Sequence, residues 1–296
     1  MRKINTSTSN PIFTSALVAL DNHLQLNSRA ISTRTTYTRA LKTFMYTMDK
    51  LPEECTQREI LQYFIDFKTK NTIQNATLKQ YIFSIKYYLY NISNTPEIFS
   101  KIPIPRVKRY NIDVLNVDEI FTLLSLCKNI RERIILELLY ETGMRIGELS
   151  RLKLEDIDFF HNSISIINSK NMVTRTVFFG ENLKSTLKEY LRSSKSLFSD
   201  TLLSKKYHPF ISLSKTGIYW ALKSVVKRSF IKKRVTAHSL RHSFSVHYLN
   251  FGGSIFQLQK LLGHKHIETT CHYLQYSIMR DLKNISILDE ALKINS

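Results

Sequence analysis

The sequence predicts a mainly α-helical protein with a small β-sheet, divided into two domains. All seven glycines lie at or after Gly143, apolar residues recur at helical spacing along much of the chain, and two short β-branched runs flank a polar turn near residue 170. A stretch without glycine has little scope for tight turns of positive φ, so the first 140 residues favour helices. The second half is expected to mix helices with a small amount of strand.

The composition is that of a globular protein, which argues against a disordered or fibrous chain. Hydrophobic residues make up 43% of the 296 residues and charged residues 23%. No apolar run approaches the roughly 18 to 20 residues that a membrane span needs. Polar residues interrupt the weak apolar patch from Ile12 to Leu20, so we do not expect a signal peptide. The three scattered cysteines fit a reducing cytoplasm; they are Cys55, Cys127 and Cys271.

The first domain is predicted to be a bundle of about four helices between Pro11 and Tyr90. Three stretches each place apolar residues on one helical face; they are Tyr37, Leu41, Phe44, Met45 and Met48, then Leu61, Phe64 and Ile65, then Leu78, Ile82, Ile85 and Leu89. Ser32 or Thr33 is expected to cap the first of these helices, and Asn75 the last. We place this domain over residues 1–100.

A basic segment rich in proline follows over residues 101–112. Pro103 and Pro105 forbid a helix and favour an extended chain. Arg106, Lys108 and Arg109 would let the segment lie along a phosphate backbone, and a plain interdomain linker is compatible with the same pattern.

The second domain, over residues 113–296, is expected to mix helices with one hairpin. Helical patterns cover 117–127, 131–141, 181–193, 215–229, 238–250 and 254–262. The β-branched runs 163–167 and 173–179 flank the polar turn 168–171 and predict the hairpin. Near the end of the chain one apolar stripe predicts a short helix that either docks onto a neighbouring protomer or packs on its own domain; its residues are Met279, Leu282, Ile285 and Leu292.

The charge of the chain points to a polyanionic partner. There are 43 Lys and Arg against 24 Asp and Glu, a formal net charge of +19. Between Asp200 and Glu268 the chain has no acidic residue. A surface with so large an excess of positive charge repels itself unless it binds a polyanion. Nucleic acid is the foremost candidate, because neutralising its phosphates releases counterions. A generally basic protein is the alternative. In the stretch free of acidic residues, Lys232, Lys233 and Arg234 are predicted to contact DNA.

Three clusters in the second half carry candidate chemistry. The first runs from Glu141 to Leu152 and places Arg145 between two glycines at a helix junction, with Glu148 three residues on to orient the guanidinium. The second contains His238 and Arg241 on one helical face. An arginine can bind the nonbridging oxygens of a phosphate while an imidazole beside it moves a proton.

The third cluster runs from Leu261 to Tyr273. Gly263 is expected to end the preceding helix, and His264 then lies nine residues before Tyr273. Taken alone, a tyrosine is more often a packed aromatic than a nucleophile. Zinc binding by His238 and His242 at i and i+4 is a rival interpretation of the second cluster, disfavoured because no acidic ligand occurs nearby in the sequence.

Together the three clusters resemble the tyrosine recombinases, the family of phage-integrase and Xer-like enzymes. The similarity rests on Thr142-Gly-Met-Arg145-Ile-Gly-Glu148, on His238-Ser-Leu-Arg241-His242 and on Leu262-Gly-His264 with Tyr273 nine residues later. It spans about 130 residues, including the hairpin. The resemblance implies a helical core-DNA-binding domain of the SAM-like type, joined by a basic linker to an α+β catalytic domain.

The resemblance also implies a role for each matching residue. Arg145 and Arg241 would bind the scissile phosphate, and Tyr273 would attack phosphorus to give a 3′-phosphotyrosyl link. His238 would accept or position the tyrosine proton, Lys170 in the hairpin turn would protonate the leaving 5′-oxygen, and His264 would hydrogen-bond the phosphate.

Glu148 would act as the supporting acid. Relatives usually have glycines beside the hairpin lysine, whereas Ser169 and Asn171 flank Lys170, and Arg175 is the nearest basic substitute. The remaining histidines are interpreted as structural or DNA-contact residues; they are His242, His247, His266 and His272.

Such a reaction needs neither metal nor nucleotide cofactor, because two guanidiniums supply the charge and the phosphotyrosine conserves the energy of the broken bond. The expected partner is double-stranded DNA, bound by a homotetramer in the cytoplasm at the nucleoid. A monomeric relaxing topoisomerase and a catalytically silent DNA-binding accessory protein of the same fold are the alternatives. Integration of a mobile element, dimer resolution and inversion would use the same pocket, so the sequence does not choose among them.

Overall fold

The computed structural model describes residues 10–107, 113–167, 174–193, 201–205 and 208–277. The chain divides into two compact units, Met1–Tyr110 and Asn111–Ser296. Lys108, Arg109 and Lys170 lie outside the described residues, as does the apolar stripe expected near the end of the chain. Within the described residues, no helix is both long and apolar enough to cross a membrane.

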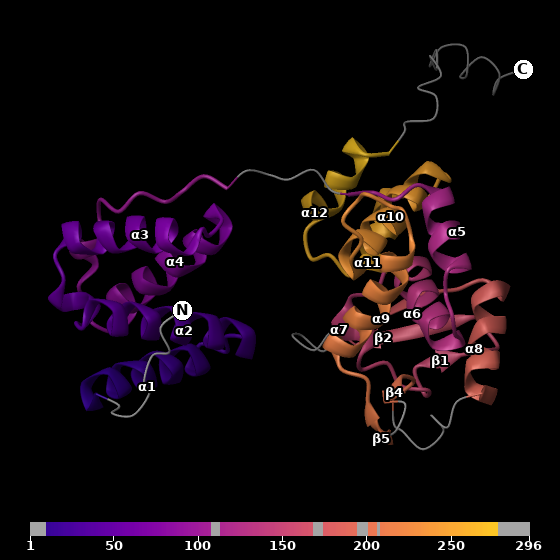
Figure 1. Ribbon diagram of the computed structural model, residues 1–296, viewed down its shortest axis with the longest axis horizontal. Coiled ribbons are helices and arrows are strands. Elements are labelled where there is room, and N and C mark those ends of the chain that lie inside the picture. The colour runs from indigo at the N-terminus through magenta and orange to yellow at the C-terminus, as the bar shows by residue number, and fades with distance from the viewer. Residues whose placement is uncertain (1–9, 108–112, 168–173, 194–200, 206–207, 278–296) are drawn as a thin grey trace, which may run out of the picture. The chain divides into compact units, whose positions relative to one another are not determined.

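The first unit is a helical bundle, which confirms the prediction for this part of the chain (Figure 1). Its four helices are α1 (Pro11–Leu26), α2 (Ile31–Met48), α3 (Gln57–Asn71) and α4 (Asn75–Asn91), with short 3₁₀ helices at η1 (Pro52–Glu54) and η2 (Pro96–Phe99). Their apolar faces meet in one core that includes Leu20, Leu41, Phe44, Ile60 and Ile85. Burial of such side chains is the main term that stabilises a bundle.

The predicted helix caps in this unit were wrong. Helix α2 begins one residue before Ser32, with Ala30 at its N-cap and no side-chain cap. Helix α4 is preceded by Gln74, and Asn75 is its first residue. The Asn75 amide instead donates a hydrogen bond to the Arg106 carbonyl at 2.9 Å. This bond holds the chain after η2 against the start of α4.

The second unit contains eight helices in its described part. They are α5 (Val117–Ser125), α6 (Ile130–Glu141), α7 (Ile146–Leu149), α8 (Glu181–Ser193), α9 (Lys215–Arg228), α10 (Ala237–Asn250), α11 (Ile255–Leu262) and α12 (Ile267–Cys271), and the 3₁₀ helix η4 (His272–Gln275) follows α12. Helix α6 is central: it packs against α8, α9 and α10, and Ile134, Leu136 and Leu138 on it are fully buried. The loops at its carboxyl end are therefore fixed by the core.

Two small antiparallel sheets complete this unit. The first has the order β1 (Ile157–Asp158), β2 (Ser163–Ile167) and β3 (Thr174–Phe178), and pairs Ile167 with Thr174 and Ser163 with Phe178. Strands β2 and β3 form the predicted hairpin. The second sheet pairs β4 (Ser204–Lys205) with β5 (His208–Ser212) through an irregular register. Its first strand is only two residues long, which is too short for an alternating pattern to predict.

Candidate active site

The loop between α6 and α7 brings the first cluster into contact with α10. Gly143 adopts φ +60°, and a Cβ there would lie 2.5 Å from Phe244 Cδ1 on α10. Only glycine combines this left-handed backbone with so close an approach. The Gly143 carbonyl can then accept a hydrogen bond from the Arg241 Nη1 at 2.6 Å. The two predicted clusters are thus joined through the main chain, although 98 residues separate them.

Glu148 holds two arginines at the start of α7. The Arg145 backbone N–H donates to Glu148 Oε2 at 2.7 Å and its Nη1 donates to Oε1 at 3.0 Å. Arg175 on β3 donates from Nη1 and Nη2 to the same carboxylate at 2.9 and 2.7 Å. Burial alone would raise the pKa of Glu148, but the hydrogen bonds from Arg175 and Arg145 outweigh it and lower the pKa to about 2. Glu148 is therefore a carboxylate that orients the half-exposed Arg145 side chain.

Arg175 is a structural brace rather than a substitute for Lys170. Besides its two bonds to Glu148, its Nε donates to the Leu261 carbonyl at 2.7 Å. Only 9% of its side chain is exposed. Its guanidinium therefore ties β3 to α7 and α11, and it is not placed to give a proton to a leaving oxygen. The sequence interpretation missed this role because the partners lie far away along the chain.

Arg241 is buried in the middle of the site, with 2% exposure. Its Nη2 donates to the Leu262 carbonyl at 2.7 Å and to His264 Nε2 at 3.1 Å, in addition to the Nη1 bond to Gly143. Burial, followed by the charge of Arg145, lowers the pKa of Arg241 to about 10, whereas Tyr273 acts in the opposite direction. The guanidinium remains charged at neutral pH and is held in one orientation before any substrate arrives.

His264 is fixed between Arg241 and α12. Because an arginine only donates, His264 Nε2 accepts the bond from Arg241. Its Nδ1 then carries the proton and donates to Thr270 Oγ1 at 2.9 Å. Burial, Arg241 and Arg145 together lower the pKa of His264 to about 4, so the ring is neutral. Gly263, in the left-handed conformation that ends α11, turns the chain so that His264 faces this site.

Tyr273 is buried in η4 within a small apolar cluster. Its ring packs with Val246, Leu258 and Leu262. Its hydroxyl lies 3.0 Å from His242 Nδ1. The ring planes of Tyr273 and His264 lie within 15° of each other, with centroids 6.3 Å apart. The hydroxyl of Tyr273 therefore lies against His242, and its ring lies beside that of His264, both in the same chain.

The contact between His242 and Tyr273 is the main feature that sequence interpretation missed. The sequence predicts only a structural or DNA-contact role for His242, and the family resemblance gives the tyrosine proton to His238. Among the described residues, His242 is the histidine whose ring nitrogen lies within hydrogen-bond distance of the Tyr273 hydroxyl. His238 instead packs edge-on against His242, with ring centroids 4.0 Å apart. The signal in the sequence was present, since His242 directly follows Arg241 on the same helix.

His238 lies beside the two arginines. Burial lowers its pKa, and the charges of Arg241 and Arg145 add to the effect. The structure therefore brings Arg145, His238, Arg241, His264 and Tyr273 together in one region, with Glu148 behind Arg145. Lys170 alone of the predicted catalytic residues lies outside the described residues.

The other histidines of this domain lie elsewhere. His247 lies five residues after His242 on α10, and its Nδ1 is 2.8 Å from the Tyr140 hydroxyl. His266 and His272 are exposed. Among the described residues, no group of three His, Cys, Asp or Glu side chains is arranged to hold a metal ion.

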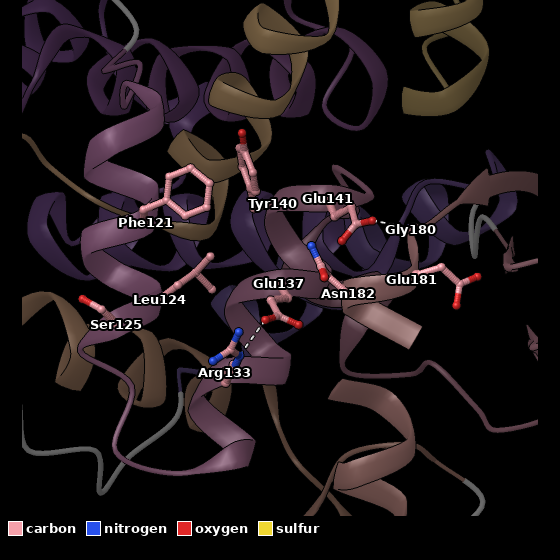
Figure 2. Close-up of a pocket in the computed structure, with 10 residues that line it drawn as sticks. All are labelled: Phe121, Leu124, Ser125, Arg133, Glu137, Tyr140, Glu141, Gly180, Glu181 and Asn182. Atoms are coloured by element: carbon pink, nitrogen blue, oxygen red, sulfur yellow. Dashed lines mark hydrogen bonds and ion pairs between the residues drawn. The ribbon is translucent and has the colours of Figure 1, made fainter. Parts of the chain in front are cut away.

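A separate hollow of about 650 Å³ lies over α5, α6 and the start of α8 (Figure 2). Three carboxylates line it together with two aromatic rings; they are Glu137, Glu141, Glu181, Phe121 and Tyr140. Burial raises the pKa of Glu141. The hollow shares none of its lining residues with the arginine and histidine cluster.

The predicted DNA-contact residues differ in their surroundings. Arg106, Lys232 and Arg234 are exposed. Lys233 donates to Glu119 Oε2 at 2.6 Å and to the Val114 carbonyl at 3.0 Å, so its charge is compensated within the protein. Lys233 is therefore a weaker candidate for phosphate contact than its neighbours.

Helix α9 adds a basic and aromatic face that was not predicted. Trp220 is 57% exposed and Tyr219 is 43% exposed. The Lys223 ammonium lies 5.0 Å from the Trp220 ring centroid and 5.7 Å from that of Tyr219. Exposed aromatic rings beside cations are features of protein surfaces that bind nucleic acid. The spacing of Tyr219 and Lys223 at i and i+4 was the available signal.

Comparison with known proteins agrees with both units. Residues 113–278 match the phage integrase family, and residues 17–96 match the N-terminal SAM-like domain of phage integrases. The chain is 31% identical to the tyrosine recombinase XerA of Saccharolobus solfataricus over 261 residues, which are 84% of this chain and 83% of that protein. It is 29% identical to XerC of Staphylococcus aureus over 249 residues, 80% of this chain and 78% of that one.

A solved structure shares the fold. A lambda integrase dimer bound to a COC′ core site matches with a TM-score of 0.72 and 19% identity, over 86% of this chain and 96% of that chain. The fold predicted from the sequence, a helical SAM-like domain with a mainly α catalytic domain and a small sheet, is confirmed. The chain belongs to the phage integrase family, and it is a tyrosine-type site-specific DNA recombinase.

Proposed function

We propose that this recombinase cleaves and rejoins double-stranded DNA through a 3′-phosphotyrosyl intermediate on Tyr273. The observation that carries the proposal is the convergence of the Tyr273 hydroxyl, three histidines and two arginines from separate stretches of one domain. Attack by the phenolic oxygen forms the bond to phosphorus and releases a 5′-hydroxyl. Religation reverses the step, so the phosphotyrosine conserves the energy of the broken bond and no nucleotide cofactor would be needed. The two guanidiniums would supply the positive charge that a metal ion supplies in other phosphoryl transfers.

Arg241 and Arg145 take complementary parts in binding the scissile phosphate. Arg241 is buried and held by two backbone carbonyls, so its charge is preorganised and no reorganisation is needed when negative charge develops on the phosphate. Arg145 keeps nearly half of its side chain exposed and is aligned by Glu148, so it can reach the phosphate from the solvent side. His264 and His238 would hydrogen-bond the same group, and Lys170 would protonate the leaving 5′-oxygen.

The DNA would lie against the basic surfaces of both domains. Arg106, Lys108 and Arg109 in the linker and Lys232 and Arg234 before α10 would bind phosphates, with Lys233 contributing less. The face of α9 formed by Tyr219, Trp220 and Lys223 would add stacking and charge. Phosphate contacts fix position, whereas the sequence preference depends on base contacts.

Complete recombination would require a homotetramer that exchanges one pair of strands and then the other. The apolar stripe of Met279, Leu282, Ile285 and Leu292 is the segment that we propose for contacts between protomers. The protein would act in the cytoplasm at the nucleoid, on a mobile element, plasmid or chromosomal site.

The adduct assay tests the proposed function. Binding sites are first selected from a randomised duplex pool by the purified protein, and a duplex of the selected sequence is nicked near the cleavage point so that the broken strand is lost. The wild type should then accumulate a covalent protein–DNA adduct. Tyr273→Phe should bind the duplex and form no adduct, whereas Tyr276→Phe, three residues on, should behave as the wild type. Binding without an adduct by the wild type would instead support a catalytically silent accessory protein.

A further inference from the structure

We propose that His242 is a catalytic residue of this recombinase, and that its Nδ1 accepts the phenolic proton of Tyr273 when the tyrosine attacks DNA. The inference rests on the proposed function, because it assigns the proton acceptor for that nucleophile. It moves this role from His238, to which the family resemblance had assigned it.

The geometry at the nucleophile favours His242. Its Nδ1 lies 3.0 Å from the Tyr273 hydroxyl, the separation of an O–H···N hydrogen bond. A general base must lie within this reach of the proton that it removes. Both residues are held: His242 on α10, and Tyr273 by the apolar cluster around η4.

The two neighbouring histidines are placed for other tasks. Both ring nitrogens of His264 are already bonded, Nε2 as acceptor from Arg241 and Nδ1 to Thr270, so it has no lone pair for the tyrosine proton. His238 stacks edge-on against the His242 ring, and its pKa responds to Arg241 and Arg145. Its ring thus packs on His242, and among the described residues it is the His242 ring nitrogen that lies within hydrogen-bond distance of the Tyr273 hydroxyl.

The charges around His242 keep it neutral and able to accept a proton. The groups that act on it are His238 and Arg241 on its own helix, His264 in the loop after α11, and Tyr273 in η4. No carboxylate of the described residues is among them. Burial, followed by His238, Arg241 and His264, lowers the pKa of His242 to about 4. At neutral pH the ring therefore has a lone pair to receive the hydroxyl hydrogen.

The proposed step balances in protons and bonds. The Tyr273 Oη–P bond forms while the P–O5′ bond breaks, and the phenolic proton passes to His242 Nδ1. The leaving 5′-oxygen takes a proton from the general acid, which we assign to Lys170. On religation the 5′-hydroxyl attacks phosphorus, the imidazolium of His242 returns its proton to the phenolate, and the site regains its starting state.

The chain offers a matched control for this role. His247 lies on the same helix, and its Nδ1 is likewise within hydrogen-bond distance of a tyrosine hydroxyl, at 2.8 Å from that of Tyr140. Its pKa is likewise lowered by burial. His247→Asn therefore reproduces the loss of a buried histidine–tyrosine bond on α10 without touching Tyr273.

The test measures the rate of adduct formation on the nicked duplex between pH 6 and 8.5. His242→Asn keeps an acceptor oxygen near the position of Nδ1 but cannot hold the proton. We expect its rate at pH 7 to fall about 10²-fold or more, and to rise with pH as hydroxide takes the place of the missing base. The wild type and His247→Asn should share a flat profile. Duplex binding and thermal unfolding of each variant show whether it remains folded.

Three outcomes would overturn the inference. The first is a rate for His242→Asn within about threefold of the wild type, with an unchanged pH profile. The second is an equal loss in His247→Asn, which would indicate a structural effect. The third comes from ¹⁵N NMR of the histidines in the free protein, and does not depend on DNA: a proton on Nδ1 of His242 would mean that the imidazole donates to Tyr273 instead. Failure of the proposed function differs from all three, because the wild type itself would then form no adduct.

Discussion

The guanidinium of Arg241 donates a hydrogen bond to the Gly143 carbonyl at 2.6 Å, and this bond joins the two arginine-bearing segments of the active site. It exists because Gly143 adopts a left-handed conformation while Phe244 packs against its Cα. The position of the Arg241 guanidinium thus depends on the absence of a side chain 98 residues away.

Gly143→Ala should lower both stability and cleavage. The methyl group would meet Phe244 Cδ1 at 2.5 Å and would also strain the positive φ, so we expect unfolding by denaturant to show a loss of about 2–4 kcal/mol. Gly252→Ala is the control, because its φ is +89° but nothing lies within 4 Å of the added Cβ. It should cost only the strain of about 1 kcal/mol. Equal losses in the two variants would show that the contact with Phe244 contributes nothing.

Arg175→Met should destabilise the protein without changing the chemistry directly. It removes the bidentate partner of Glu148 and leaves that buried carboxylate with Arg145 alone, which should cost about 3–5 kcal/mol. Lys70→Met breaks an exposed pair with Asp66 and should cost less than about 1 kcal/mol. Denaturant unfolding of both variants provides the comparison. A loss for Arg175→Met as small as that for Lys70→Met would contradict the role of Arg175 as a brace.

Stability should rise with pH between about 4 and 6.5. The pKa of His242 and of His264 is lowered from 6.5 to about 4 in the folded state, so the unfolded chain binds more protons in this interval. The penalty is absent above pH 6.5, grows as the pH falls, and is complete below about 4. Each histidine contributes at most about 1.4 kcal/mol per pH unit. His242→Asn should therefore reduce the slope of unfolding free energy against pH, and an unchanged slope would show that this histidine is not neutral when folded.

Duplex binding should weaken steeply as the salt concentration rises, and the three adjacent basic residues before α10 should contribute unequally to this salt dependence. Lys232→Ala and Arg234→Ala should each make the slope of log K against log salt shallower by about 1. Lys233→Ala should change it less, because the Lys233 ammonium is already paired with Glu119. Fluorescence anisotropy between 50 and 300 mM salt would measure the slopes. Three equal changes, or none, would exclude this segment as the predicted phosphate contact.

Local sequence patterns predicted the helices and strands of this protein better than they predicted its long-range contacts. Most helices of both units and the hairpin of β2 and β3 follow from spacing and residue type, which are properties of short segments, whereas the short helix α12 and strand β1 were not predicted. The motif residues from Arg145 to Tyr273 were identifiable because the family resemblance compares whole patterns. The pairing of β4 with β5 was missed because β4 has only two residues, too few to carry an alternating pattern.

The partners of individual side chains were not predictable in the same way. Arg175 was interpreted only as a basic substitute for Lys170. Its partner Glu148 is 27 residues away along the chain, and only tertiary packing brings the two together. His242 was interpreted as a structural or DNA-contact residue, because nothing local shows that Tyr273, 31 residues away along the chain, lies against it. The cap predicted at Asn75 was wrong because α4 begins at Asn75 itself, and the bond from its amide to the Arg106 carbonyl joins residues that are 31 apart along the chain.

The most direct measurement of the central claim is to locate the covalent bond by mass spectrometry of the trapped adduct after trypsin and nuclease digestion. Cleavage after Lys265 and Arg280 gives one peptide that contains both Tyr273 and Tyr276, so fragmentation must distinguish them. We expect a nucleotide bonded through its 3′-phosphate to the oxygen of Tyr273. A nucleotide on Tyr276, on a serine, or on any residue outside this peptide would contradict the proposed mechanism.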